Sequence, residues 1–147
     1  MAFNYPLLNF HFTVEWGGSQ IGFSEVSGLE MTTEVVEYRN GASPNYTITK
    51  LPGKHNYNNI TLKRGTFQGD NEFFDWWKET KILGGGDNLR RDLVIKLLNA
   101  QHEPVVVWSV RNAFPVHLKF SDLKADTSDF AIESLEIAHE GMIIEHT

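Results

Sequence analysis

The sequence predicts a mainly β fold, either an antiparallel barrel or a two-sheet sandwich, with about eight strands and one α-helix covering an open side. Two observations lead to this prediction. Apolar and polar residues alternate with period two through much of the chain, and a helical period replaces this alternation only once, after Asp70. The length of 147 residues, without a visible repeat or linker, indicates a single domain over residues 1–147.

Strands are predicted where residues alternate or where β-branched and aromatic residues are dense. The predicted strands are Asn9–Trp16, Gln20–Val26, Leu29–Tyr38, Asn59–Phe67, Leu93–Leu98, Val105–Val110, Val116–Phe120 and Phe130–His139. Gly17–Gly18, Ser27–Gly28 and His102–Pro104 mark turns between them. Within the last strand the alternation slips phase between Ile132 and Leu135, which predicts a β-bulge near Glu133–Ser134.

The helix is predicted to begin with Asp70 as its N-cap and to end at Gly84, the first glycine of a flexible Gly84–Gly86 connector. Acidic Glu72 suits the first turn of this helix, and lysines suit its last turn. The apolar half of the helix is expected to pack on the sheet as core, and it comprises Phe73, Phe74, Trp76 and Trp77.

Composition argues against nucleic acid as a partner and against several kinds of site. The formal net charge is −6, from 19 acidic against 13 basic residues, whereas a protein that binds nucleic-acid phosphates needs a basic face. The absence of cysteine excludes disulfides, zinc–thiolate sites and thiol nucleophiles. Neither a Sec-type signal peptide nor a membrane-spanning apolar run is visible, so synthesis and folding in a cytoplasm are expected, with a destination outside the cell by a non-Sec route left open.

Motifs for catalysis are not found. The six histidines lack zinc-ligand spacing, the Gly84–Gly86 run follows a helix instead of preceding one, and no serine lies in Gly-x-Ser-x-Gly. We therefore expect no enzyme activity, no cofactor and no metal site. The basic pairs Lys63–Arg64 and Arg90–Arg91 are expected to act as ion-pair partners in an acidic protein.

Two other classes of function stay open on the residues alone. Trp16 and Trp108 lie at strand positions, where core packing or a subunit contact is the favoured interpretation. The same two rings could instead form a sugar-stacking platform, which would make the chain a monomeric carbohydrate-binding β-sandwich module. A small hydrolase would need a convergent acid–base set, and the histidines and glutamates are too scattered to nominate one.

Asn40–Tyr57 is the longest segment without periodicity, and its Gly, Pro, Asn and Ser content predicts a long loop. Loops of that length in a compact domain are usually functional or disordered.

Short blocks in order along nearly the whole chain resemble the phage tail-tube family of contractile tails and phage-like injection systems, which includes T4-like and Hcp-like tubes. Two departures are Asn40, where the family commonly has glutamate, and Val116–Lys119, where relatives often place a basic residue earlier. The blocks are Phe23–Glu30, Val36–Gly41, Leu51–Gly53, Ile60–Gly65, Trp76 or Trp77, Arg90–Asp92, Trp108, Asn112–Pro115, Ile132–Glu136 and Ala138–Gly141.

The resemblance implies a structural subunit that forms six-membered rings, stacked head to tail into a hollow tube. Its implied partners are further copies of itself, a contractile sheath, baseplate, spike and tube-terminating proteins, and effectors or DNA as cargo in the lumen; insertion of the subunit itself into a membrane is not implied. The long loop would contact the next ring, through Asn40, Gly41, Pro44, Tyr46, Lys50, Lys54, His55 and Tyr57.

Overall fold

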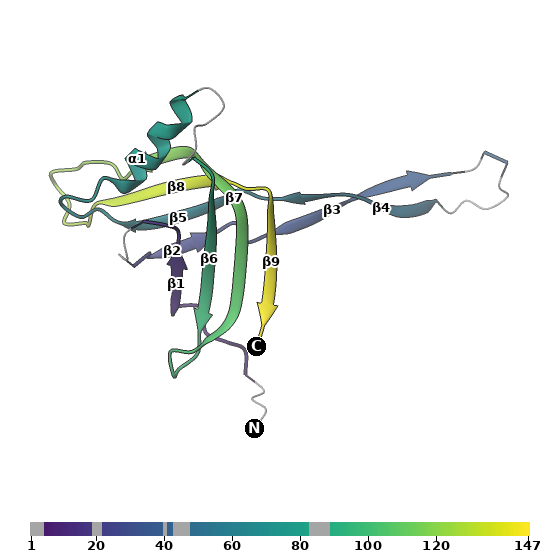
Figure 1. Ribbon diagram of the computed structural model, residues 1–147, viewed down its shortest axis with the longest axis horizontal. Helices are drawn as coiled ribbons and strands as arrows, with labels where there is room; N and C mark the ends of the chain where they lie inside the picture. The colour runs from purple at the N-terminus through teal and green to yellow at the C-terminus, as the bar shows by residue number, and fades with distance from the viewer. Residues whose placement is uncertain (1–4, 19–21, 40, 43–47, 83–88) are drawn as a thin grey trace.

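The computed structural model describes residues 5–18, 22–39, 41–42, 48–82 and 89–147, and Figure 1 shows their arrangement. Nearly all of the ordered structure is β, and one short helix lies over one side of the body. The elements are β1 (Phe12–Glu15), β2 (Glu25–Ser27), β3 (Met31–Tyr38), β4 (Thr49–Tyr57), β5 (Ile60–Gly65), α1 (Glu72–Lys78), a 3-10 turn (Glu79–Lys81), β6 (Arg91–Leu98), β7 (Pro104–Phe120), β8 (Ile132–Ala138) and β9 (Gly141–His146).

Two antiparallel sheets share the long strand β7. The first sheet has the strand order β1-β6-β7-β9 and the second has the order β7-β8-β5-β2. This arrangement confirms the predicted mainly β fold with one helix. The prediction did not include β9, because Gly141–His146 contains an apolar run instead of an alternating pattern.

The strand β7 passes from one sheet to the other at Asn112, whose φ of 52° lies in the left-handed region. The backbone N–H of Asn112 donates to a carboxylate oxygen of Asp92, and its side-chain amide donates to Glu140. Asparagine tolerates this backbone conformation better than most residues because its short side chain bonds locally. The two strands predicted for this stretch, Val105–Val110 and Val116–Phe120, are therefore one strand with a corner.

The core lies between the two sheets and under α1. Trp16 packs edge-on against Phe73 and beside Trp76, so the predicted core role of Trp16 is confirmed and a sugar platform at Trp16 is excluded by its 1% exposure. Trp108 packs against the same cluster while remaining partly exposed. The buried cluster consists of Trp16, Ile60, Leu62, Phe73, Trp76, Leu93, Ile95, Val110, Ala113, Leu135, Ile137 and Met142.

A buried charge network lies inside this apolar core. The Arg64 guanidinium donates from Nε to Glu133 at 2.6 Å and from Nη2 to Asp70 at 2.9 Å, and it lies over the Phe73 ring at 4.0 Å. The predicted β-bulge near Glu133–Ser134 is wrong, because β8 pairs with β5 without a register shift. The phase slip in the sequence instead reflects a glutamate that faces the core, where Arg64 neutralises it.

The helix is shorter than predicted. Its N-cap is Asn71 instead of Asp70, although the Asp70 carboxylate still accepts a hydrogen bond from the Glu72 backbone N–H at 3.1 Å. The α-helix ends at Lys78, and the 3-10 turn carries the chain to Ile82, which is extended. The predicted end at Gly84 and the Gly84–Gly86 connector lie outside the described residues.

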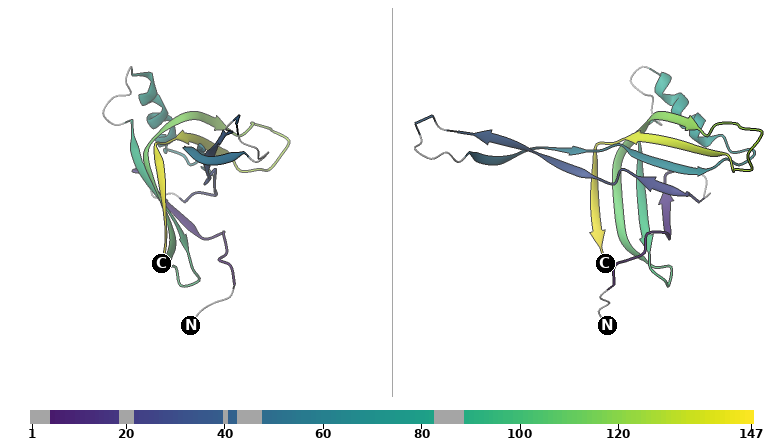
Figure 2. Two further views of the ribbon diagram at one scale, coloured as in Figure 1. Left: turned by 90° about the vertical axis from the view of Figure 1, so that its right-hand side faces the viewer. Right: turned by 180° about the vertical axis from the view of Figure 1, so that it is seen from behind.

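The predicted loop over Asn40–Tyr57 is also corrected. Its second half is the strand β4, which pairs antiparallel with β3, so the two strands form a hairpin with a bulge between Thr33 and Val35. This β3–β4 hairpin projects away from the body of the molecule, as Figure 1 and the right view of Figure 2 show. The sequence did not predict β4 because almost every residue in both strands is exposed, which leaves no buried face to produce alternation.

Gly28 is expected to be intolerant of substitution. Its φ is +88°, and a Cβ at this position would lie 2.1 Å from the Asn59 carbonyl oxygen. Gly28→Ala should lower the free energy of unfolding by about 2 kcal/mol or more, because a left-handed L-residue costs roughly 1–2 kcal/mol before any clash. Urea titration followed by circular dichroism measures this loss. Gly22→Ala is the control, because nothing lies within 4 Å of its added Cβ, and an equal loss in both variants would contradict the explanation.

Candidate assembly surfaces

The β3–β4 hairpin carries an apolar face that nothing in the described chain covers. Val36 pairs with Leu51 and Tyr38 pairs with Thr49, so these side chains share one face of the ribbon. Val36, Tyr38 and Leu51 are all exposed. Because an isolated two-stranded hairpin is at best marginally stable in water, this face indicates a surface that is completed by another molecule.

Polar contacts hold the two strands of the hairpin together. The Thr33 hydroxyl lies 3.0 Å from His55 Nδ1, and the Asn56 side-chain amide donates to Glu34 at 3.1 Å. At Gly53 the strands approach so closely that a Cβ would lie 2.9 Å from a methyl group of Val36. The glycine therefore permits the close approach of the two strands.

Charge is divided between the two strands of the hairpin. The strand β4 contains two lysines and no acidic residue, whereas β3 contains two glutamates and no basic residue. The two long edges of the ribbon consequently differ in sign, with β4 basic and β3 acidic.

Four of the eight residues predicted to contact a neighbouring ring lie on this hairpin. Lys50, Lys54, His55 and Tyr57 lie on β4, where all four are exposed, and Tyr57 also lies beside the His139 ring. Gly41 is exposed in the turn that follows β3. The remaining three predicted residues, Asn40, Pro44 and Tyr46, lie outside the described residues.

The first sheet has two open edges. In the described part of the chain, β1 pairs only with β6 and β9 pairs only with β7, so each has one side without a strand partner. Ile143 and Ile144 on β9 are exposed. An uncovered edge is a template for another chain, and it persists in native proteins when a partner strand completes it.

The face of the first sheet that points away from the core mixes polar and apolar side chains. One cross-strand row of this face consists of Thr13, Lys96, Val107 and Glu145, and the next row consists of Glu15, Val94, Ser109 and Ile143. The Lys96 ammonium donates to Glu15 at 3.0 Å across β1 and β6. This face thus presents both signs of charge to water.

The predicted ion-pair role of the basic pairs is confirmed for three of the four residues. Arg64 pairs with Glu133 and Asp70, Lys63 pairs with Glu25 at 3.1 Å, and Arg90 pairs with Glu140 at 2.9 Å.

The fourth basic residue, Arg91, stacks over the rings of Trp76 and Trp16 at 4.7 and 5.6 Å. Burial lowers the pKa of this guanidinium, and the nearby Glu72 and Glu79 carboxylates act in the opposite direction. Arginine remains charged despite such a shift, because its ordinary pKa is far above neutral.

Among the described residues no three or more His, Cys, Asp or Glu side chains gather as a metal-binding group. One histidine pair does form, with His102 Nδ1 lying 3.1 Å from His11 Nε2. No spacing pattern could predict this pair, because 91 positions separate the two residues. None of the described helices is long and apolar enough to cross a membrane.

Within the described residues, the two-sheet β fold has two open sheet edges and an uncovered hairpin, and these features define a class of protein, a β-rich subunit suited to self-assembly. The family model of the T4-like virus tail tube protein gp19 matches residues 8–143 of this chain. The chain belongs to this tail tube family, which agrees with the resemblance found in the sequence. A search of the curated proteins gives no match.

Solved structures of injection-system components are similar over the whole chain. A chain of the sheath–tube complex of the PVC extracellular contractile injection system in its extended state is 31% identical, with a TM-score of 0.86 and 98% and 94% of the two chains covered. A chain of the anti-feeding prophage tube-terminating cap is 28% identical, with a TM-score of 0.84 and 100% and 95% covered.

A more distant match shows the fold alone. Hcp1 from Flavobacterium johnsoniae is 13% identical, with a TM-score of 0.56 and 94% and 97% of the two chains covered. The family and these matches are structural tube proteins and injection-system components, and the alternative of a carbohydrate-binding module has no support.

Proposed function

We propose that this chain is the inner-tube subunit of a contractile injection particle, which forms six-membered rings that stack into a hollow conduit inside a contractile sheath. The observation that carries the proposal is the four-stranded sheet with an open edge at either side. Successive strands in this sheet are antiparallel, so β1 and β9 run in opposite directions. The β9 edge of one copy can therefore continue into the β1 edge of the next as another antiparallel pair.

A contact between two different edges is heterologous, and it makes a closed ring when the rotation between copies closes. Four strands from each of six copies would form a wide barrel. Because barrels of about 16 to 18 strands already enclose an aqueous channel, a barrel of this size leaves an open lumen. The face that carries Thr13, Glu15, Lys96 and Glu145 would line that lumen, while α1 and the second sheet lie on its outside.

The partners follow from the same assignment. The matched proteins occur in a sheath–tube complex, a tube-terminating cap, a sheath/tube terminator and a baseplate, which supports sheath, terminator and baseplate proteins as partners of this chain. Protein effectors or DNA would pass through the lumen. The subunit itself would perform no catalysis and bind no cofactor, and it would be made and assembled in the bacterial cytoplasm before release of the particle.

Electron microscopy and light scattering of the purified protein test the proposal. Rings of six copies, or stacked tubes with an open centre, are the expected result, and a monodisperse monomer over a wide concentration range would overturn the proposal. Ile144→Asp should abolish ring formation, because it places a charge beside the open β9 edge. Ile82→Asp is a control at an exposed apolar residue that follows the 3-10 turn and belongs to neither edge strand, and it should leave the rings intact.

A further inference from the structure

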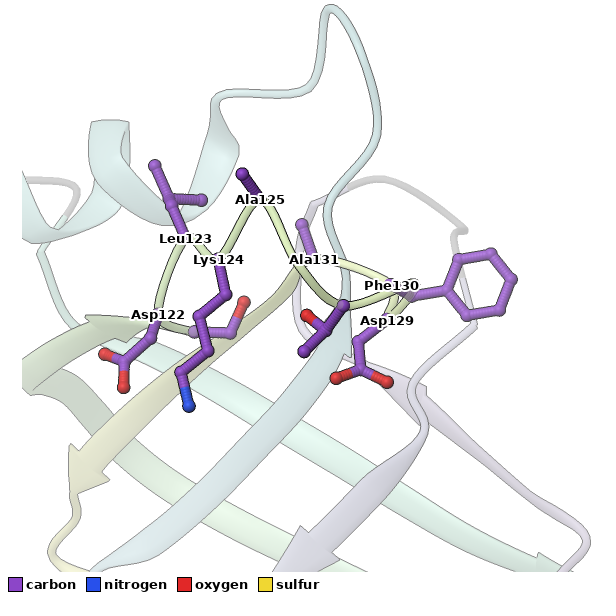
Figure 3. A pocket seen from close by; sticks show the side chains of 9 residues that line it. Asp122, Leu123, Lys124, Ala125, Asp129, Phe130 and Ala131 are labelled. Carbon is purple, nitrogen blue, oxygen red and sulfur yellow. The ribbon is translucent and has the colours of Figure 1, made fainter.

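The loop between β7 and β8 carries two apolar side chains that are almost completely exposed. Leu123 is 93% exposed and Phe130 is 91% exposed. Figure 3 shows Leu123 and Phe130 pointing outward from opposite ends of the loop, around a hollow of about 630 Å³ that the loop itself encloses. A single exposed leucine needs no explanation, but two large side chains with this exposure in one short loop indicate a surface that becomes covered.

This β7–β8 loop lies at the opposite end of the molecule from the β3–β4 hairpin. Figure 1 shows the loop at one end of the long axis and the hairpin at the other, and the reverse view in Figure 2 agrees. One copy therefore cannot bring its own hairpin to its own loop. Two copies arranged head to tail can do so, and each copy then offers one hairpin and one loop to its neighbours.

The two surfaces match in chemistry. The loop offers Leu123 and Phe130, and the hairpin offers the uncovered face of Val36, Tyr38 and Leu51. The charges are complementary as well. The loop contains three aspartates and one lysine, whereas the β4 edge of the hairpin contains two lysines and no acid.

We propose that the β7–β8 loop is the receptor for the β3–β4 hairpin of a second copy of this chain. Leu123 and Phe130 pack on the apolar face of the hairpin, and the aspartates of the loop lie along its lysine-bearing β4 edge. The proposal rests on the proposed function, and it adds to that function the surface on which the hairpin docks. Burial of Leu123 and Phe130 supplies the apolar area, and the charges fix which edge of the hairpin faces the loop.

Crosslinking between two single-cysteine variants tests this contact. The chain has no cysteine of its own, so each introduced thiol is unique. Leu51→Cys and Phe130→Cys proteins, one of them enlarged by a tag, are mixed, assembled and treated with a short bismaleimide crosslinker. The expected result is a mixed dimer of the two sizes. The matched control pairs Leu51→Cys with Ile82→Cys, an exposed site beyond the helix, and it should give at most one tenth of that product.

Electron microscopy of the same samples separates this proposal from the proposed function. Tubes that form without the crosslinked dimer of the Leu51→Cys and Phe130→Cys proteins would overturn the proposal that the loop is the receptor. The proposed tube function would still stand. Samples with neither tubes nor product would overturn both. A Phe130→Cys thiol that stays open to a maleimide dye inside assembled tubes would also overturn the proposal, because that loop would then be free for a protein outside the tube.

Discussion

Replacing Arg64 with methionine is expected to lower the free energy of unfolding by about 3–5 kcal/mol. The Arg64 side chain is 1% exposed, and its guanidinium is paired with the buried carboxylate of Glu133 and with Asp70. Methionine fills much of the same volume beside Phe73 but leaves the Glu133 carboxylate in the core without its cation. Urea denaturation followed by circular dichroism measures the loss.

The neighbouring Lys63 supplies the control. Its ion pair with Glu25 joins two half-exposed side chains, and such pairs contribute about 0–1 kcal/mol, so Lys63→Met should change stability little. The double variant Arg64→Met with Glu133→Leu should recover part of the loss, because it removes the unpaired charge. A loss at Arg64 no larger than the loss at Lys63 would show that the buried network contributes little.

The second large effect is expected for Trp76→Ala, at about 3–5 kcal/mol. Trp76 is fully buried beside Trp16, and its indole N–H donates to the Leu89 carbonyl at 2.6 Å. The substitution removes the ring, leaves a cavity beneath the guanidinium of Arg91, and leaves the Leu89 carbonyl without this donor. Chemical denaturation followed by circular dichroism measures the loss independently of tryptophan fluorescence.

The adjacent Trp77 provides a matched comparison. Trp77 is only partly buried, and Lys81 lies over its ring at 5.4 Å, a contact of roughly 0.5–1 kcal/mol at an exposed site. Trp77→Ala should therefore cost less than half as much as Trp76→Ala. Equal losses would mean that both rings belong to the core, as the helical period alone had indicated.

Periodicity predicted most of the strands because those strands have one buried face. It predicted the helix for the same reason, since Phe73 and Trp76 face the sheet. Phe74 and Trp77, which the same pattern assigned to the core, lie at the margin of the contact. How far a helix packs onto a sheet depends on the tertiary arrangement, which local spacing does not contain.

The buried pair Arg64–Glu133 could not be predicted in this way. Each residue looks like a misplaced charge in its own strand, and 69 positions separate them. Only the pairing of β5 with β8 brings them to one place, at the cross-strand pair in which Arg64 lies opposite Glu133. A phase slip in one strand can therefore have either of two causes. It can indicate a bulge, or it can indicate a buried charge whose partner lies in another strand.

The candidate assembly surfaces were the least predictable part. The hairpin lacks alternation because both of its faces are exposed. Without a buried face, β4 has no reason to carry an apolar residue at every second position. Leu123 likewise lies in a loop, where no periodic rule applies. Phe130 was predicted as the first residue of a strand, but β8 begins at Ile132 and leaves Phe130 in the loop. The resemblance to tail tubes located the hairpin segment, and the structure supplied its shape.

The corner in β7 has a mechanical consequence for the proposed tube. The same strand would form part of the lumen wall and part of the outer layer, and Asp92 and Glu140 brace its turning point at Asn112. An axial load on the outer layer therefore reaches the inner wall along covalent backbone, without relying on side-chain packing between layers. Sliding of one sheet against the other would have to bend β7 at this corner and break the hydrogen bonds of Asn112 to Asp92 and Glu140.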